Sequence, residues 1–266
     1  MVDAATSFKK SGFTDEQAKD LALVATAYQN VADEAISAGD SADFIISQMK
    51  AFNIEAEDSM HIIDAVNQVS NNFAVSSADL ATNIGKASSA LAIGGVEYEQ
   101  ALGMMTAITE INRSGAKSAR GLVSIQSRYN QILDETSTTG AKLIDFYNKN
   151  NIQLYDQEGQ LRSLWDTLSD VAEIWDTLDE NEQKYFLNIQ AGANQSVQLG
   201  ALMSNFGTAI EATNTALNSS GSAMKENEAY MESLNKMGLL KTALTAGTSL
   251  ELSLLTCHGD IGKGNR

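Results

Sequence analysis

Residues 164–178 read LWDTLSDVAEIWDTL, and this stretch decides the fold class. Apolar side chains recur in it every three to four residues, as they do along one face of an α-helix. That face comprises Leu164, Trp165, Leu168, Val171, Ala172, Trp175 and Leu178, and the opposite face carries Asp166, Asp170, Glu173 and Asp176. The pattern predicts an amphipathic helix whose tryptophan-bearing face lies in a core and whose acidic face is solvated.

Shorter helical patterns cover most of the remaining chain. Predicted helix starts lie at the capping-box sequence beginning at Thr14, near Asn53, at Ser76 or Ser77, near Glu97, near Ser118 and at Asp179. Predicted helix stops lie at Gly39, Gly94-Gly95, Gly115 and Gly192. One minor extended or hairpin segment is predicted near residues 152–161. The fold class is therefore all-α, an irregular multi-helix bundle of short helices.

Proline is absent from all 266 residues, although average usage would give roughly 13. Because proline breaks helices but is favoured in turns, its absence indicates helices joined by flexible Gly and Ser turns. With 43% hydrophobic but 6% aromatic residues, the composition suits helix packing better than a large aromatic-lined pocket. These features favour a mechanical or structural protein over an enzyme.

The helices show neither a heptad pattern lasting three repeats nor a strict solenoid period, so no coiled coil or regular repeat is predicted. A run of Thr and Ser between Asp134 and Gly140 is a candidate linker. We predict an N-terminal helical part at residues 1–133, a C-terminal helical part at 134–236 and a frayed, truncated tail at 237–266.

The chain carries 18 basic and 34 acidic residues, a net charge of −16. Such a charge opposes general binding to nucleic acid and to anionic membranes. The most apolar stretch, Met237–Leu255, contains Lys241 and Glu251, so no transmembrane segment is predicted. A single cysteine, Cys257, allows no intrachain disulfide.

Three acidic patterns are candidate cation sites. Glu57, His61 and Asp64 have the spacing of one helix face, but they lack the Glu-x-x-His spacing of di-iron helices. A solvent-facing acidic helix start is the favoured interpretation there. The acidic row of residues 166–176 is predicted to be an ordinary solvated face. Asp156-Gln157-Glu158-Gly159 lacks the ligand alternation of a calcium loop, so a turn is predicted.

The basic residues Arg113, Lys117, Arg120 and Arg128 lie in a segment without acidic residues. Two interpretations remain open: an ordinary charged surface, slightly favoured, or a surface that meets an acidic partner. Cys257 and His258 are adjacent and lack a third activating group, so we predict no catalytic residue, and no metal or cofactor. The glycines Gly94-Gly95 and Gly192 are predicted to end helices, because no Lys-Ser/Thr follows as in a phosphate loop.

Three passages together resemble the core region of phage tail tape measure proteins of the lactococcal-phage type. They are residues 49–64 (MKAFNIEAEDSMHIID), residues 95–122 from GVEYEQALG to ARGL, and residues 155–192 from YDQEG to QAG. The resemblance covers roughly residues 12–236. Family members are usually much longer and carry apolar and coiled segments that this sequence lacks, so we expect a fragment of such a protein.

The resemblance implies structural work. Tape measure proteins lie inside the tail tube, set its length during assembly, and leave at infection to assist genome entry. It implies the tail tube protein, tail assembly chaperones, tail tip or baseplate proteins and further copies of the chain as partners. The implied locations are the virion's tail tube lumen and, during assembly, the host cytoplasm.

Two alternatives stay open at this point. One is a soluble bacterial helical interaction or adaptor protein, and the other is a helical peptidoglycan-degrading module. The second requires a catalytic glutamate in a cleft or a set of metal ligands, and no residue pattern in the sequence stands out for either.

Overall fold

The computed structural model describes residues 2–237, and most of these residues are helical. The all-α prediction is confirmed. The chain divides into two compact units, Met1–Ala223 and Met224–Arg266. Nearly all of the predicted tail at 237–266, including Cys257 and His258, lies outside the described residues.

The helices are short and closely spaced along the chain. The α-helices are α1 (Val2–Lys10), α2 (Asp15–Val31), α3 (Ala38–Phe52), α4 (Ser59–Asn72), α5 (Ser77–Ile93), α6 (Tyr98–Asn112), α7 (Gly115–Tyr129), α8 (Thr138–Lys149), α9 (Leu164–Ile174), α10 (Glu180–Ala191), α11 (Ser196–Ser204) and α12 (Phe206–Leu217). Short 3-10 segments are η1 (Ala56–Asp58), η2 (Asn130–Leu133) and η3 (Trp175–Thr177). Residues 222–237 form a further helix.

Three predicted helix starts are confirmed by their hydrogen bonds. Thr14 and Gln17 form the capping box of α2. The Ser76 hydroxyl accepts from the backbone N–H of Asp79 and caps α5. Asp179 caps α10 in the same way. In each case the cap and its partner are two or three residues apart, which is why the sequence alone reveals them.

Several predicted boundaries are wrong. Gly39 lies inside the first turn of α3, which Ser37 caps, while α2 already ends at Val31. Asn53 ends α3 in the left-handed conformation (φ 54°), and α4 begins later, at Ser59. Gly115 opens α7 instead of ending α6, and Ser114 is the cap.

The predicted helix of residues 164–178 is also shorter than its pattern suggests. The α-helical part, α9, ends at Ile174 and continues as the 3-10 segment η3. The predicted extended segment is confirmed as a minimal hairpin, in which Tyr155 and Leu161 form one isolated antiparallel bridge.

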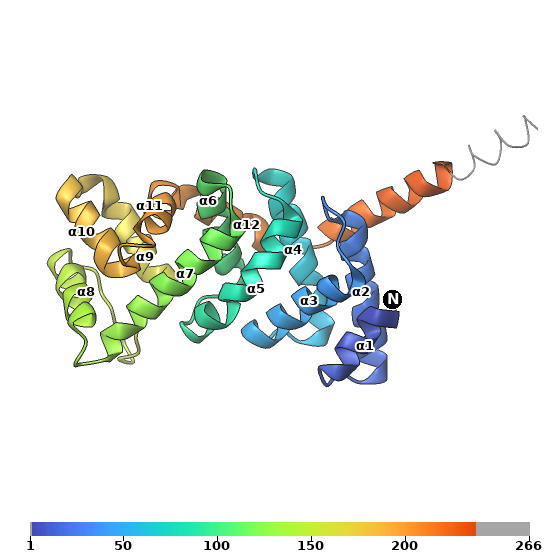
Figure 1. Ribbon diagram of the computed structural model, residues 1–266, viewed down its shortest axis with the longest axis horizontal. Helices are drawn as coiled ribbons and strands as arrows, with labels where there is room; N and C mark the ends of the chain where they lie inside the picture. Colours follow the sequence, from blue (N-terminus) through green and yellow to red (C-terminus); the bar gives the residue numbers. More distant parts are fainter. Residues whose placement is uncertain (1, 238–266) are drawn as a thin grey trace, which may run out of the picture. The chain divides into compact units, whose positions relative to one another are not determined.

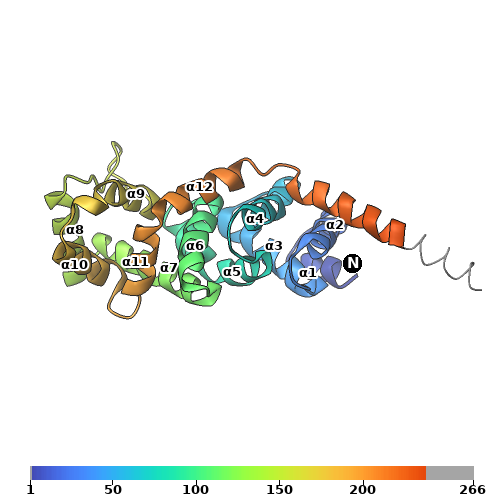
Figure 2. The same cartoon turned by 90° about the horizontal axis from the view of Figure 1, so that it is seen from above.

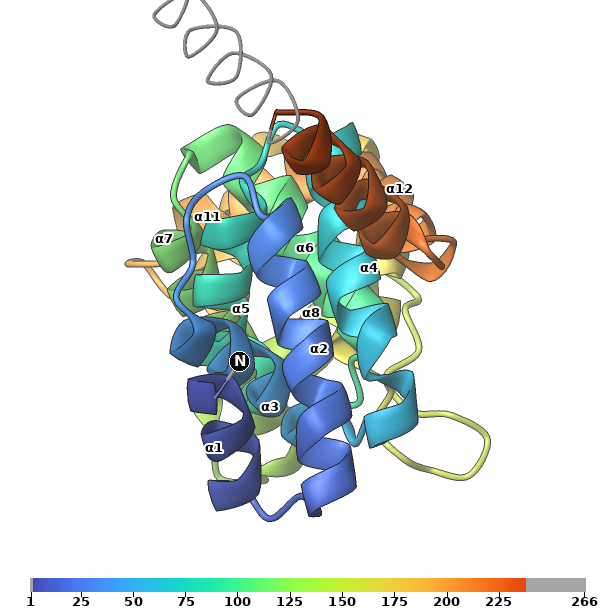
Figure 3. The same cartoon turned by 90° about the vertical axis from the view of Figure 1, so that its right-hand side faces the viewer.

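Within residues 1–223, helical hairpins stack side by side in two rows. One row consists of α2, α4 and α6, and the other of α3, α5 and α7, each helix contacting the next in its row (Figure 1). Figure 3 shows the rows end-on, with α3, α5 and α7 to one side of α2, α4 and α6. Stacked hairpins are a solenoid-like arrangement. The uneven starts of the hairpins, at Asp15, Ser59 and Tyr98, explain why no strict period appears in the sequence.

A third layer forms when the chain returns to the middle of the stack. α12 packs along α6 and also contacts α4. Figure 2 shows α12 on one side of these two helices and α5 and α7 on the other. Consequently α6 is buried on every side, with all residues from Ala101 to Thr109 in the interior.

The helices α8–α11 complete this unit around an aromatic cluster. Phe146 stacks on Phe186 with ring centroids 4.6 Å apart, and Tyr147 meets Phe186 edge-on at 6.1 Å. The buried hydroxyl of Tyr147 donates to Gln190 Oε1 at 2.9 Å, and the amide of Gln190 donates to the Ile125 carbonyl at 3.1 Å. This chain of contacts joins α8 and α10 to α7.

The unit that begins at Met224 is described as far as Met237 and is helical there. Its exposed large apolar side chains are Met224, Tyr230, Met231, Leu234 and Met237. An ion pair between Lys236 and Glu232, 2.7 Å long, spans one turn of this helix.

Candidate functional site

Glu57, His61 and Asp64, the candidate metal ligands, do not lie together. Glu57 belongs to η1 and not to α4, so it does not share a helix face with His61 and Asp64. His61 Nε2 lies 2.6 Å from Glu99 Oε1 on α6, whereas Asp64 accepts a hydrogen bond from Gly221, in the turn after α12. Among residues 2–237, no group of three or more His, Cys, Asp and Glu side chains is placed to hold a metal ion.

The favoured interpretation of this helix start also needs correction. Asp64 is buried, with 3% of its surface exposed, and its two oxygens accept from the backbone N–H groups of Gly221 and Ala223, both at 2.8 Å. These N–H groups lie at the start of the helix of residues 222–237. Asp64 therefore acts as a helix N-cap supplied from a distant part of the chain. No pattern in the sequence reveals this pairing, because 159 residues separate Asp64 from Ala223.

The His61–Glu99 pair is a partly buried electrostatic link between α4 and α6. The hydrogen bond that His61 donates to Glu99 raises the pKa of His61 above 6.5, although desolvation opposes the rise. Desolvation alone would raise the pKa of Glu99, but the hydrogen bond and charge of His61 leave it below 4.5. Both shifts favour an ion pair between an imidazolium and a carboxylate.

The four basic residues of the acid-free segment do not form one cluster. Arg113 donates to the Ala74 carbonyl at 2.8 Å. Arg128 donates to the Ile189 carbonyl at 2.9 Å and so binds the carbonyl end of α10, where a cation is favoured by the helix dipole. Lys117 and Arg120 remain exposed on α7. Two of the four cations thus serve the fold, and the other two are free to face solvent.

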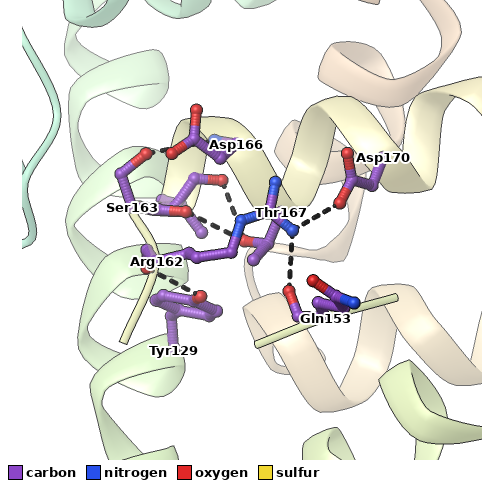
Figure 4. A network of polar contacts seen from close by, with 8 residues as sticks. Tyr129, Gln153, Arg162, Ser163, Asp166, Thr167 and Asp170 are labelled. Carbon is purple, nitrogen blue, oxygen red and sulfur yellow. Dashed lines mark hydrogen bonds and ion pairs between the residues drawn. The ribbon is translucent and has the colours of Figure 1, made fainter. Parts of the chain in front are cut away.

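The acidic row of α9 is not uniformly solvated. Glu173 and Asp176 are exposed, but Asp170 pairs with Arg162 at 2.6 Å. The same guanidinium donates to the Gln153 carbonyl at 2.7 Å, so Arg162 ties both strands of the minor hairpin to α9 (Figure 4). The hydrogen bond that Arg162 donates to Asp170 raises the pKa of Arg162 further, which keeps the guanidinium charged.

Tyr129 fixes the other side of this network. Its hydroxyl donates to the Arg162 carbonyl at 2.9 Å (Figure 4). Desolvation by burial raises the pKa of Tyr129 to about 12, so the phenol stays protonated and remains a donor. The network is a structural anchor: each polar group is used to hold the hairpin, and the cluster presents neither a nucleophile with an activating base nor an open set of ligands.

A family model described as phage-related minor tail protein matches residues 1–192 of the chain. The chain belongs to this family. No solved structure matches it. Membership makes the protein a component of a phage tail, with a structural role in the virion and with other tail components as its partners.

In this minor tail protein the family match ends at the close of α10. The remaining helices, α11 and α12, lie outside the match, yet α12 packs on α6 and α4 near the centre of the matched segment. Asn205, which precedes α12, donates to the Ala107 carbonyl at 3.1 Å. The matched region therefore depends on the following residues for part of its packing.

Three smaller predictions for the minor tail protein concern a turn, the two tryptophans and the glycines at helix ends. The predicted turn is confirmed, since the Asp156 carboxylate accepts from the N–H groups of Glu158 and Gln160 and Gly159 has φ of 79°. Trp165 and Trp175 pack on the core but are only partly buried, against Phe206 and Phe186 respectively. Gly94-Gly95 and Gly192 end helices as predicted.

Within residues 2–237 of the minor tail protein, no helix combines the length and the apolar composition that crossing a bilayer requires.

Proposed function

We propose that this chain is the core portion of a tape measure protein, which sets tail tube length during assembly and leaves the tail to assist genome entry. The observation that carries the proposal is the family match over residues 1–192. In this proposal the chain is in the host cytoplasm during tail assembly and lies in the tail tube lumen of the finished virion. Its partners are the tube protein, the assembly chaperones, the tail tip or baseplate and further copies of itself.

The physical basis of a measuring role is the fixed rise of a helix. An α-helix advances about 1.5 Å per residue, so chain length can encode distance, and 266 helical residues would span roughly 400 Å. The described chain is instead folded back into stacked hairpins. We propose that the stack is the free form and that the chain is drawn out inside the tube.

The stack suits such a transition. Apart from α12, which packs on α6 and α4, each hairpin contacts mainly the hairpins next to it in the chain, so the stack can open one hairpin at a time once α12 has moved away. The turns between the helices contain no proline, and the helices themselves keep their internal hydrogen bonds when the hairpins separate. Slow amide hydrogen exchange in the isolated chain is expected for the folded form. An isolated chain without slow amides would contradict a compact free state.

Tail length is the direct test. The hairpin of α4 and α5 together with its following loop, residues 59–97, is one unit of the stack. Its in-frame deletion in the full-length parent should shorten tails by about 60 Å, at about 1.5 Å per residue, if the segment is extended helix in the tube. Tail lengths are measured by electron microscopy of assembled particles.

A matched control separates length from sequence. Replacing residues 59–97 by an unrelated helical sequence of equal length should restore the original tail length, even though the native contacts of α4 are gone. Normal tails of unchanged length after the deletion would rule out a measuring role for this segment.

We also propose that the chain is not an enzyme. A peptidoglycan-degrading site needs a carboxyl group whose pKa is raised so that it can act as a general acid. The described carboxyl groups with displaced pKa values, Asp33, Glu99, Asp134 and Glu182, are all displaced downward. Loss of turbidity from cell walls treated with the purified chain would contradict this proposal. Normal tail assembly without the chain would favour the adaptor alternative.

A further inference from the structure

The three parallel helices α3, α5 and α7 present one continuous outer face, on the side away from α2, α4 and α6. Their order and direction follow from close contacts between them. Ser47 of α3 lies beside Gly85 of α5, and Asp79 near the start of α5 accepts from the N–H of Gly115 at the start of α7, at 2.9 Å. The starts of the three helices therefore lie at the same end of this face. Residues at equal distances from these starts lie at the same height along the helix axes.

One edge of the outer face is acidic. Glu34, Asp40 and Asp43, at and before the start of α3, are exposed. They line a groove of about 620 Å³ between α3 and α5, together with Thr82 and Gly85. We call these three acids the acidic edge.

The opposite edge of the same face is basic. Lys117 and Arg120 of α7 are exposed, and neither forms an ion pair within residues 2–237. Lys86, also exposed, lies on α5 between the two edges and donates to Asn83 at 2.6 Å. We call Lys117 and Arg120 the basic edge. In a chain of net charge −16, two adjacent cations without carboxylate partners indicate a surface that another acidic group can neutralise.

The middle of the outer face is small and polar. Ser47, Thr82, Gly85 and Ser89 lie there with short side chains or none, and the longer side chain of Lys86 is held to Asn83 of the same helix. A second surface can therefore approach the α5 backbone closely at Thr82 and Gly85.

We propose that this face binds the same face of a second copy of the chain, about a two-fold axis that lies between the two faces and runs parallel to α5, over Thr82. Such an axis lays α3 of one copy on α7 of the other, with the two helices running in the same direction, so that equal heights meet. The acidic edge, near the height of the start of α5, then meets Lys117 and Arg120, which lie slightly further along α7. The match occurs twice, as in any isologous interface.

The inference rests on the charges of this face and not on the tape measure function. A chain that stays monomeric would refute the dimer and leave the tail-length experiment open. Salt dependence alone is a poor test, because salt screens both the attraction between the edges and the repulsion between two chains of net charge −16. Charge reversal at a fixed, near-physiological ionic strength is decisive.

Two reversed variants test the pairing. Glu34→Lys with Asp43→Lys makes the acidic edge mainly basic, and Lys117→Glu with Arg120→Glu makes the basic edge acidic. Asp40 is left unchanged because its carboxylate accepts from the Ser37 hydroxyl. By sedimentation velocity, wild type is expected to dimerise, each variant alone to associate at least tenfold more weakly, and an equimolar mixture of the two to form a heterodimer.

Matched controls carry the same charge changes elsewhere. Lys19→Glu with Lys142→Glu, and Glu173→Lys with Asp176→Lys, alter exposed residues away from this face and should leave the dimer intact. Circular dichroism checks that each variant is folded. If a reversed pair does not fold, the neutral changes Asp43→Asn and Arg120→Gln take its place, each expected to weaken the dimer.

A crosslink tests the axis independently. A residue near a two-fold axis meets its own copy, so Thr82→Cys in a Cys257→Ser background should form a disulfide-linked dimer on mild oxidation, whereas Thr136→Cys in the exposed loop before α8 should not. A monomeric wild type, a dimer indifferent to both reversals, or a mixture that stays monomeric would each overturn the proposal.

Discussion

Gly103 lies where α6 crosses α12, and a side chain there has no room. A Cβ atom at this position would overlap the Thr213 hydroxyl and the Ala209 carbonyl. Because the obstacle includes backbone, it cannot simply rotate away, and overpacking of this kind costs about 1–3 kcal/mol. We predict that Gly103→Ala lowers the free energy of unfolding by that amount, measured by urea denaturation.

Gly207 supplies the matched control, since it lies in the same helix pair but is exposed. A Cβ atom there meets nothing within 4 Å. Gly207→Ala should be neutral or stabilise the protein by about 0.4–1 kcal/mol, because alanine reduces the entropy of the unfolded chain. Equal effects of the two substitutions would show that α6 and α12 are not in close contact.

The His61–Glu99 pair makes stability depend on pH on two sides. The pKa of His61 is raised, so its contribution is complete below about 6.5 and is lost as the pH rises through the folded value. The pKa of Glu99 is lowered, so its contribution is present above about 4.5 and is lost as the pH falls through the folded value. The pair should therefore stabilise most between these two pH values.

Thermal unfolding of wild type and His61→Gln across this range checks the prediction. The difference in Tm should be largest near pH 5.5 and should shrink above pH 7. A difference that stays constant from pH 5 to pH 8 would mean that His61 contributes packing and no charge.

At the scale of the helices, carboxylates from one hairpin cap helices of another. Asp33, after α2, accepts from the N–H groups of Ser77 and Ala78 at the start of α5, both at 3.1 Å. Asp79 does the same for α7 and Asp64 for the helix of residues 222–237. Each carboxylate lies at the positive end of a helix dipole, so capping joins neighbouring layers of the stack.

Asp33→Asn should weaken the junction between α2 and α5 by about 1 kcal/mol. Desolvation opposes the shift, but hydrogen bonds from Ser76, Ser77 and Ala78 lower the pKa of Asp33 below 3.8. Its contribution is therefore present above that pH and is lost as the pH falls through the folded value. The stability gap between wild type and Asp33→Asn should narrow below about pH 4.

Asp20→Asn, an exposed residue of α2, is the control for this change and should have an effect near zero at every pH. Equal behaviour of the two variants in denaturant titrations at pH 7 and pH 3 would mean that the Asp33 cap contributes nothing to the stack.

The sequence predicts the local caps but not the distant ones. Thr14, Ser76 and Asp179 bind N–H groups within three residues, so their spacing is visible in the sequence. Asp64 binds a segment more than 150 residues away, and its side chain looks like any acid at a helix start. The candidate site was misjudged for the same reason, because the partner of His61 lies on another hairpin.

Glycine was the less reliable signal. Gly94 and Gly192 end helices as expected, but Gly103 and Gly115 are needed because another helix comes close to them. A glycine at a helix end and a glycine at a helix crossing look alike in sequence, since both simply lack a side chain. This ambiguity accounts for the wrong boundary at Gly115.

At the scale of the whole unit of residues 1–223, the burial of α6 determines which part opens last. Its amides can exchange only if the helices packed around it, chiefly α12, α5, α11 and α7, move away, whereas α1 packs mainly on α2 and α3. Native-state hydrogen exchange should therefore find the slowest amides between Leu102 and Ile108, and faster exchange in α1 and α8.

This order also bears on how the chain could be drawn out. If opening proceeds from the ends of the stack, the amides of α1 and α8 exchange through openings that expose less surface than the opening of α6. Denaturant then lowers the free energy of opening most steeply for α6. Uniform protection across the three helices would instead indicate one all-or-none unit, which cannot be opened hairpin by hairpin. A Gly103→Ala variant should reduce protection in α6 and α12 while leaving α1 unchanged, because the overlap lies at that crossing alone.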